Sequence, residues 1–480
     1  MKLLFLNPFY GKGFCKTARW FAKSRARERR HPDYLCTAIA LLEKGGHICK
    51  FIDGTVNNIS IDETREICRG FGPDAVIINS TTPSIESDLE YAKMCKKEFG
   101  AGLITIMVGA HVSAEPEDTL RKAGGALDAV ARREYDYTLK EFADTGNLSR
   151  LAGISYFKDD GIIHNPDRPF IDDLDNLPFP AWHHINLYDY YAPAKRNPFL
   201  TVITGRGCEG RCTFCLFPQV MYGRKYRPRS PERVLDEIES DIKLFPGLKE
   251  IMFEDDTFTL HKFHGRLEKI CQGMLDRRIK VGWSCNARPD IQDFSILKLM
   301  KRSGCRMVCV GFESGNEEIL ANIKKGISLD AMSKFTHLCK KAGLSVHGCF
   351  VIGAQGETNL SIKKTVRFAT GLPIDTVQFS GLCPYPGTEF YRWCKDKNYL
   401  IPGNWKEWVD ENGEQRTIID YPHLSCETMN KAIDSSLYSF YLRPRYILSQ
   451  VFHPKSLHDI QSRLKGLLNF INHVWVTKTR

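Results

Sequence analysis

Three cysteines fall within eight residues of the chain, at Cys208, Cys212 and Cys215. They follow an apolar run, residues 199–204, that predicts a buried β-strand, so the thiols are expected on the loop leaving that strand's carboxyl end. Thiolates at short spacing bind iron–sulfur clusters or zinc. A four-iron cubane held by three thiolates has one iron left to bind another ligand.

Two other interpretations of these cysteines are a structural zinc site and a group of buried core thiols. Structural zinc usually takes four ligands, often arranged as two pairs, and the sequence contains no second Cys-x2-Cys pair. The spacing therefore favours an iron–sulfur cluster that keeps one coordination position open.

The elements that must position this loop alternate between strand and helix patterns six times, between about residues 196 and 392. One intervening helix is expected to begin at Ser230-Pro231, because a capping serine precedes a proline at the first helical position. Six right-handed βα units predict a partial (β/α)6 barrel with its chemistry at the strands' carboxyl ends. Strands are expected at residues 199–204, 250–253, 280–284, 307–311, 345–352 and 376–380.

Polar residues and glycines follow these strands, where the ends of a parallel barrel meet at one face. Carboxylates complement a cation, an arginine suits a carboxylate, and glycines let the backbone approach a ligand closely. The structural alternatives are an acidic helix start, internal salt bridges and ordinary turns. The candidates are Asp255 and Asp256, Asn286 and Arg288, Glu313 and Ser314, and Gly353 and Gly356.

Residues 1–145 show five further strand–helix repeats, which predict a doubly wound parallel sheet of Rossmann or flavodoxin type. Ligands of such sheets bind beyond the strands' carboxyl ends. Asn7, Asp53, Ser80 and Gly109 occupy those ends here. The strands are expected at residues 3–6, 47–52, 75–78, 103–108 and 127–131.

Two further segments connect or extend these domains. Residues 146–195 form a linker with a predicted β-hairpin at 153–165, followed by prolines that preclude a long helix. Residues 393–480 form a mainly helical extension, in which residues 460–476 either pack on the barrel or lie on an anionic membrane.

The basic segment 16–30 is either a solvated face or a lid over an anionic ligand.

The cysteine spacing, with the aromatic Phe214 just before Cys215, resembles the signature of the radical S-adenosylmethionine (SAM) superfamily. The resemblance implies an oxygen-sensitive [4Fe–4S] cluster whose open iron binds SAM. A flavodoxin or ferredoxin would reduce the cluster, and SAM cleavage would give a 5'-deoxyadenosyl radical. It also implies contacts to the SAM amino group from Asp255 or Asp256, further cofactor contacts from Asn286, Arg288, Glu313 and Ser314, and an adenine-side loop at Gly353 and Gly356.

The N-terminal strand ends resemble the cobalamin-binding domain of one large branch of that superfamily. Where the branch commonly has a Gly-Glu-Gly-Glu turn, this chain has Arg133-Glu134-Tyr135-Asp136, and the two large residues are expected to narrow the space for a corrin ring. The Asp-x-His-x-x-Gly motif is absent. The domain is therefore expected either to bind cobalamin or to be a vestigial or substrate-facing domain.

Finer features resemble the hopanoid-biosynthesis-associated subgroup: residues 216–219, 283–287, 323–326 and 421–425. This resemblance implies an enzyme that modifies or rearranges the polar amino-sugar side chain of a hopanoid lipid. The alternatives are a cobalamin-dependent radical SAM methyltransferase and, from another class, a non-catalytic iron–sulfur redox or binding protein.

The composition and the N-terminal sequence indicate the cellular location and the kinds of partner to expect. An odd number of cysteines, 17, indicates reduced thiols, and the N-terminus lacks a signal-peptide pattern, so a cytoplasmic location is expected. No run approaches the ~20 apolar residues of a membrane span. The net charge of +10 fits nucleic acid, a membrane surface or an anionic partner. We expect a small-molecule or lipid-linked substrate, peripheral contact with the inner face of the membrane, and no nucleic acid.

Overall fold

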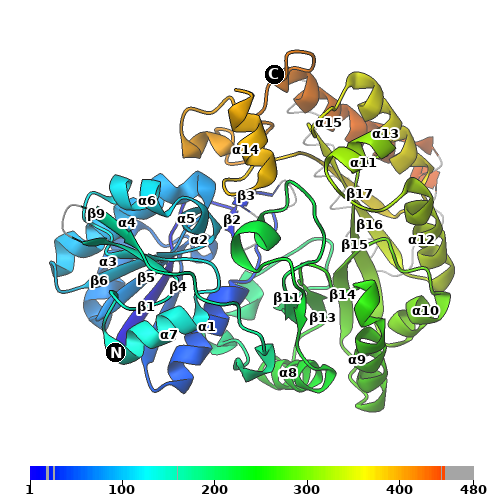
Figure 1. Ribbon diagram of the computed structural model, residues 1–480. Coiled ribbons are helices and arrows are strands. Elements are labelled where there is room, and N and C mark those ends of the chain that lie inside the picture. Colours follow the sequence, from blue (N-terminus) through cyan, green and yellow to red (C-terminus); the bar gives the residue numbers. More distant parts are fainter. Residues whose placement is uncertain (18–20, 25–26, 159–160, 445, 449–480) are drawn as a thin grey trace.

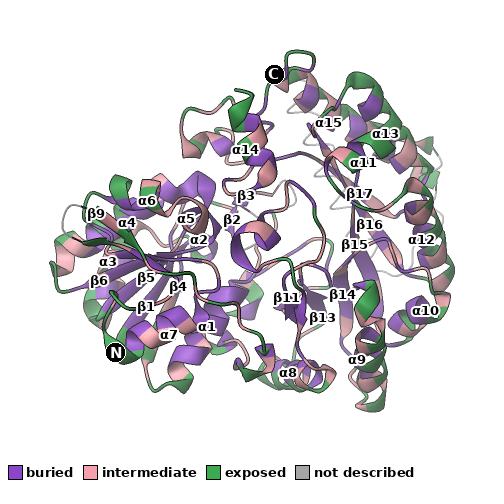
Figure 2. Ribbon diagram, in the orientation of Figure 1, coloured by how far each residue is buried: buried purple, intermediate pink, exposed green. Residues whose placement is uncertain are grey.

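The structure is a computed structural model that describes residues 1–480 except 18–20, 25–26, 159–160, 445 and 449–480. Two α/β domains lie side by side, an N-terminal one in blue and cyan and a barrel in green and yellow (Figure 1). The orange helix α14 (Glu389–Asp396) lies above the junction between them (Figure 1). In both domains buried residues fill the strands, and exposed residues gather on the outer helix faces (Figure 2).

The N-terminal domain is built on a seven-stranded sheet, ordered β4-β1-β5-β6-β7-β8-β9. The first five strands of this order are parallel, which confirms the predicted Rossmann-like sheet. The predicted hairpin forms as β8 (Ile154–Lys158) and β9 (Gly161–His164), and β8 pairs antiparallel with β7. Part of the expected linker therefore belongs to the sheet. The parallel strands are β4 (Ile48–Asp53), β1 (Lys2–Asn7), β5 (Ala75–Asn79), β6 (Ile104–Val108) and β7 (Ala129–Ala131).

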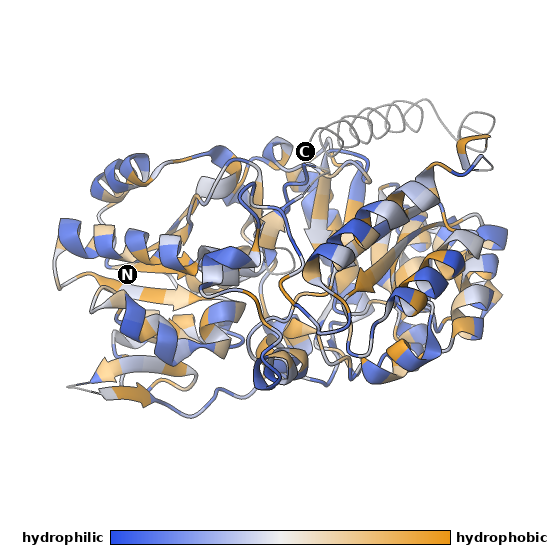
Figure 3. Ribbon diagram, turned by 90° about the horizontal axis from the view of Figure 1, so that it is seen from above, coloured by the Kyte–Doolittle hydropathy of each residue, from blue (hydrophilic) through white to orange (hydrophobic). Residues whose placement is uncertain are grey.

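Helices cover both faces of this sheet, which is why its strands are apolar almost throughout. Leu3 and Phe5 pack in one cluster with α1 (Asp33–Lys44) and α7 (Asp136–Thr145), while Leu4 and Leu6 point to the opposite face. The strands appear as an apolar layer between helices (Figure 3). The opposite face is covered by α3 (Ile61–Phe71), α4 (Ile85–Phe99) and α6 (Pro116–Ala123), and the short helices α2 (Gly54–Asn57), η1 (Thr82–Ser84) and α5 (Ala110–Ala114) follow strand ends.

The second domain is a six-stranded parallel sheet in simple sequence order, which confirms the predicted partial barrel. Two strands match their predicted bounds, and the third begins two residues later than expected. The strands are β10 (Phe199–Val202), β13 (Glu250–Phe253), β14 (Gly282–Ala287), β15 (Cys305–Glu313), β16 (Ser345–Ile352) and β17 (Thr376–Gly381). The intervening helices are α8 (Pro231–Leu244), α9 (His264–Asp276), α10 (Phe294–Arg302), α11 (Glu317–Asn322), α12 (Leu329–Ala342) and α13 (Asn359–Gly371).

The inner face of the barrel is only partly covered. Along β16, Val346 and Phe350 are buried in the core cluster that includes the helices, whereas alternate residues such as His347 and Cys349 are partly exposed. Because side chains alternate across a strand, the partly exposed set faces the barrel interior. The same alternation continues along β17, where Gln378 belongs to the interior set.

The start of the basic segment does not match its default interpretation as a solvated face. It belongs to an antiparallel hairpin of β2 (Phe14–Lys16) and β3 (Phe21–Lys23), most of whose described residues are buried, whereas Arg27 is exposed and Arg29 and Arg30 are half-buried. Lys16 is fully buried because it forms an ion pair with Asp88 of α4. A lysine within a charged run can therefore be internal when its partner lies far away in sequence.

The described part of the C-terminal extension packs on the rest of the protein. The hydroxyl of Tyr441, in α15 (Cys426–Tyr441), donates to the carbonyl of Val377 at 2.7 Å and accepts from its amide at 2.9 Å. Trp405, in η7 (Trp405–Trp408), donates to Asp118 of the N-terminal domain at 2.9 Å. No helix among the described residues is long and apolar enough to cross a membrane. Residues 460–476 lie outside the described part.

Candidate active site

The three cysteines lie on the loop after β10, as predicted, and this loop lies between the barrel and the N-terminal domain. Cys212 is 9% exposed, and Cys208 and Cys215 are half-buried. Phe214 packs against the barrel core, so this aromatic residue anchors the loop between two cysteines. The arrangement leaves the thiols at a domain junction, partly open to a ligand.

Gln219 holds the cysteine loop in shape. Its side-chain amide donates to the carbonyls of Thr213 at 3.0 Å and Cys215 at 2.9 Å, and its oxygen accepts from the Glu389 amide at 2.9 Å. Residues 217–221 form a single π-helical turn, a feature that often occurs at functional sites. Gln219 was not among the predicted site residues, although the motif at 216–219 contains it.

The start of the loop requires glycine. Gly207 has a φ of +87°, and a Cβ there would lie 2.3 Å from the Lys225 carbonyl oxygen. Its amide donates to the Asp256 carboxylate at 2.9 Å. A Cβ on Gly210 would lie 3.2 Å from an Arg288 guanidinium nitrogen and 3.3 Å from the Cys208 sulfur. Asp256 and Arg288 are thus brought beside the cysteines.

The three consecutive carboxylates after β13 take different roles. Glu254 forms an ion pair with Arg30 at 3.0 Å. Asp255 is completely buried and accepts from the Thr204 amide and hydroxyl, both at 2.6 Å, and from the Tyr226 hydroxyl at 2.8 Å. Burial raises the pKa of Asp255. Asp256 contacts Gly207, directly before Cys208, so it is the stronger of the two predicted candidates.

The candidate residues at the ends of β14 and β15 contact different partners. Asn286 donates to the Asp255 carbonyl at 3.2 Å, while the Arg288 side chain donates to Asp290 at 3.0 Å. Glu313 has a φ of +67° and accepts from Lys325 at 2.7 Å. Burial disfavours the charge on Lys325, but attraction to Glu313 outweighs it and the pKa of the lysine is raised.

Ser314 turns away from this set, toward the outer helices. Its hydroxyl lies 3.0 Å from that of Thr365 in α13, and it is fully buried. This contact ties β15 to the helix layer. The Ser314 hydroxyl therefore contacts the helix layer, and its predicted cofactor contact stays a prediction.

Two glycines in the loop after β16 adopt a conformation that favours glycine. Gly353 and Gly356 have φ values of +102° and +81°. The Tyr421 hydroxyl donates to the Gly353 carbonyl at 2.8 Å, and the His423 ring lies 3.0 Å from the Glu357 carbonyl. The motif at 421–425 thus braces this loop from the C-terminal extension.

Two buried ion pairs join the N-terminal domain to the paired segments that flank the cysteines, β11 (Gly205–Arg206) and β12 (Arg227–Pro228). Arg206 forms hydrogen bonds with Asp136 at 2.7 and 3.1 Å, and Arg227 forms hydrogen bonds with Glu134 at 2.6 and 2.9 Å. These acids belong to the turn where both Arg133 and Tyr135 were expected to narrow a corrin site. That expectation is half wrong, because Arg133 is 39% exposed and paired with Asp167 at 2.8 Å. Only Tyr135 lines the space at the sheet edge.

A cavity with an empty volume of about 430 Å³ lies at the carboxyl edge of the N-terminal sheet. Its walls come from the strand ends on one side and from the turn after the cysteines on the other. At its edge, a Cβ on Gly109 would lie 2.3 Å from the Ser80 carbonyl, so only glycine fits. The lining includes Lys16, Asn79, Ser80, Thr81, Gly109, Tyr135, Phe217, Met221 and Tyr222.

Comparison with known proteins identifies the two domains. Residues 202–369 match the model of the radical SAM superfamily, and residues 29–143 match that of the B12-binding domain. An uncharacterized methyltransferase, PH0819 of Pyrococcus horikoshii, is 32% identical over 434 residues, which cover 90% of this chain and 92% of that protein. The chain belongs to the radical SAM superfamily, in the branch with a B12-binding domain. The prediction of a radical SAM enzyme is confirmed.

Other relatives are named for different reactions. The anaerobic magnesium-protoporphyrin IX monomethyl ester cyclase of Rubrivivax gelatinosus is 25% identical over 410 residues, covering 83% of this chain and 70% of that protein. The hopanoid C-3 methylase of Methylococcus capsulatus is 26% identical over 356 residues, covering 72% and 65%. Membership alone therefore does not fix the substrate.

Solved radical SAM structures share the whole fold. The methyltransferase TsrM from Kitasatospora setae aligns with a TM-score of 0.69 at 17% identity, covering 92% of this chain and 90% of that one. The cobalamin-dependent enzyme OxsB aligns with a TM-score of 0.74 at 18% identity, covering 99% and 72%. These likenesses confirm the order of the sheet domain and the barrel.

Proposed function

We propose that this protein is a cobalamin-dependent radical SAM methyltransferase. The observation that carries the proposal is the position of the cavity, whose walls include both Gly109 of the B12-binding domain and Phe217, just after the cysteines. A cofactor at this sheet edge would face the turn that directly follows the cysteines. The methyltransferases among its relatives favour this function over the side-chain rearrangement that the sequence motifs suggest.

The residues of the loop fit a cluster with one open iron. Cys208, Cys212 and Cys215 would hold three irons, and SAM would occupy the fourth. Asp256 and Arg288 lie beside the loop, where a carboxylate suits the SAM amino group and a guanidinium suits its carboxylate. When bound, the reduced cluster supplies the electron for SAM cleavage and cobalamin carries the methyl group.

The B12-binding domain fits a corrin only in part. Gly109 and the small polar residues that follow β5 line the sheet edge on one side of the cavity. Tyr135 and the buried Lys16 both line it. We propose that cobalamin enters by displacing one or both of these side chains.

The barrel interior supports a polar substrate. His347, Cys349 and Gln378 face it from β16 and β17, and the Arg30–Glu254 ion pair lies at the strand ends. A small molecule with hydrogen-bonding groups matches this lining. The polar head of a hopanoid lipid is the second candidate, supported by the sequence motifs, and the hopanoid C-3 methylase relative supports a hopanoid substrate in general.

The deciding experiment is anaerobic. The cluster is reconstituted, reduced by flavodoxin, ferredoxin or dithionite, and given SAM with and without cobalamin, with polar small molecules and hopanoid extracts as substrates. Cobalamin-dependent 5'-deoxyadenosine and S-adenosylhomocysteine support methyl transfer. Deoxyadenosine alone, indifferent to cobalamin, contradicts it and supports the rearrangement. Cluster-loaded protein that releases neither product with any substrate points to a redox or binding role.

Peripheral membrane contact is a further part of the proposal, because the C-terminal tail is basic and aromatic. Removing the chain after Arg443 should weaken binding to anionic liposomes. Unchanged binding would instead assign the tail to packing.

A further inference from the structure

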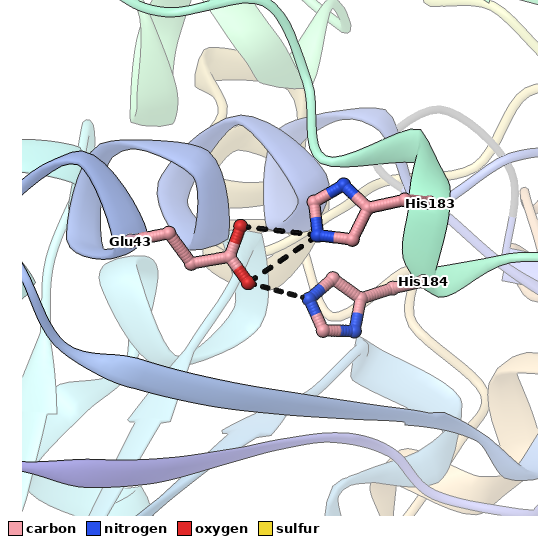
Figure 4. A group of neighbouring side chains, drawn as sticks. All are labelled: Glu43, His183 and His184. Atoms are coloured by element: carbon pink, nitrogen blue, oxygen red, sulfur yellow. Dashed lines mark hydrogen bonds and ion pairs between the residues drawn. The ribbon is translucent and has the colours of Figure 1, made fainter. Parts of the chain in front are cut away.

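A cluster of three side chains lies far from the active site. Glu43 lies in the last turn of α1, and His183 and His184 belong to the short helix η3 (Trp182–His184) in the linker. Both imidazoles turn their Nε2 atoms toward the Glu43 carboxylate (Figure 4). The distances are 2.7 Å from His184 and 3.2 Å from His183.

Neighbouring residues of a 3-10 helix point about 120° apart, so two adjacent histidines do not normally converge. Here the ring centroids of His183 and His184 lie 4.5 Å apart. One ligand atom from each of the three side chains lies within 4.8 Å of the others. Their convergence on one carboxylate matches what a shared ion would require.

The spacing of His183 is close to that of a zinc site. Ligands about 2.0–2.1 Å from zinc at tetrahedral angles lie about 3.3 Å apart, and the His183 Nε2 lies 3.2 and 3.4 Å from the two Glu43 oxygens. The His184 Nε2 lies 2.7 Å from a Glu43 oxygen, which is a hydrogen-bond distance, so this ring would move outward when an ion binds. Two imidazoles and a carboxylate suit zinc and neighbouring transition metals, whereas calcium and magnesium prefer oxygen alone. The His183 side chain is 57% exposed, which gives an ion access and leaves room for water as the fourth ligand.

We propose that Glu43, His183 and His184 bind a zinc-class divalent cation that ties the linker to α1. The 12 residues of α1 span about 18 Å, and its first turn lines the cavity, so the ion at its far end has no part in the chemistry. Its role is structural. It adds to contacts that already dock the linker on α1, such as the Ala181 amide donating to the Cys36 carbonyl at 2.9 Å.

The test uses full-length protein with the cluster loaded, so that the three loop cysteines are occupied. Zinc binding is measured by anaerobic calorimetry, and its ligands are identified by X-ray absorption at the zinc edge. We expect one equivalent, bound through two imidazoles and oxygen. His183→Gln and Glu43→Gln should each weaken binding about tenfold or more.

The matched control is His261→Gln. His261 and His264 form another close imidazole pair, with ring centroids 4.8 Å apart, that belongs to no such three-residue group among the described residues. This variant should bind zinc like the parent. Sulfur ligands at the zinc edge, binding unchanged in Glu43→Gln, or no binding at all would each overturn the proposal. Because His183 is exposed, its variant tests the site without risk to folding.

Discussion

Arg206 donates two hydrogen bonds, at 2.7 and 3.1 Å, to the two carboxylate oxygens of Asp136, and both side chains are almost fully buried. The arginine lies two positions before the first cysteine, and the aspartate begins α7 of the other domain. The contact fixes the cysteine loop to the B12-binding domain. The same ion pair therefore contributes both to the stability of the fold and to the position of the cysteine loop.

Asp136→Asn should strongly destabilise the protein. It leaves Arg206 with an incompletely compensated buried charge, and breaking such a pair typically costs about 3–5 kcal/mol. Urea unfolding followed by tryptophan fluorescence measures the change. Asp62→Asn removes an exposed i,i+3 partner of Arg65 and should shift stability by less than about 1 kcal/mol. Equal effects of the two substitutions would contradict the assigned role.

Replacing Cys208, Cys212 and Cys215 together by Ala should abolish the cluster and the release of 5'-deoxyadenosine, because these are the thiolates on the loop. Iron and sulfide analysis, the visible spectrum and product quantification check this. Replacing the fully buried Cys271, Cys285 and Cys339 instead should leave the iron content unchanged. Normal turnover in the first variant would refute the site.

Gln219→Ala should speed loss of the cluster several-fold, because the loop carbonyls of Thr213 and Cys215 lose their shared donor. The rate of bleaching in the presence of a chelator gives the effect. Gln292→Ala, which removes a single 3.3 Å hydrogen bond to Ala331, serves as the control. If both variants bleach at the parent rate, the loop does not depend on Gln219.

Glu357 should make stability depend on pH. Burial raises its pKa from 4.5 to about 7, so between these values the folded protein holds a proton that the unfolded chain has released. Its contribution to stability therefore falls as pH rises from about 4.5 to 7 and is constant above. The stability of the Glu357→Gln variant relative to the parent should therefore increase as the pH rises from 5 to 8. The stability of the exposed Glu318→Gln variant relative to the parent should not change in this way. A pH-independent difference would contradict the assignment.

Gly109→Ala should abolish cobalamin retention, because its Cβ would lie 2.3 Å from the Ser80 carbonyl at the edge of the cavity. Gly102→Ala has no neighbour within 4 Å and is the control. Retained corrin is read from its visible absorption after gel filtration. Tyr135→Ala should act in the opposite direction and tighten binding, since it enlarges the same space.

The fold follows from the sequence because strand and helix periods alternate regularly through both domains. The bounds of β13 and β16 match their predictions. β14 begins two residues later than predicted, because residues 280–281 alternate between polar and apolar as strand residues do but lie before the strand. The spacing of the cysteines was enough to predict the cluster site. The sequence could not show in which direction each side chain points: Asp255 and Asp256 are adjacent, yet Asp255 is buried and Asp256 contacts Gly207, directly before Cys208.

The direction of a side chain, which the sequence does not show, also explains the other differences between the predicted and the observed site. Arg133 and Tyr135 lie two residues apart, but Arg133 turns outward to Asp167 while Tyr135 turns into the cavity. Lys16 lies in a basic run, and its partner Asp88 is 72 positions away, so its burial depends on a contact that no local pattern reveals. Side-chain direction and distant ion pairs are properties of the assembled fold.

The pairing of β7 with β8 determines where the protein can be divided. A fragment ending at residue 145 would leave β7 with a row of unpaired amides and carbonyls, which invites pairing between molecules. It would also remove the Ile154 carbonyl that the Arg132 guanidinium contacts at 2.8 Å. A fragment extended through residue 168 keeps both the hairpin and Asp167, the partner of Arg132. Only the longer fragment should be monomeric in isolation.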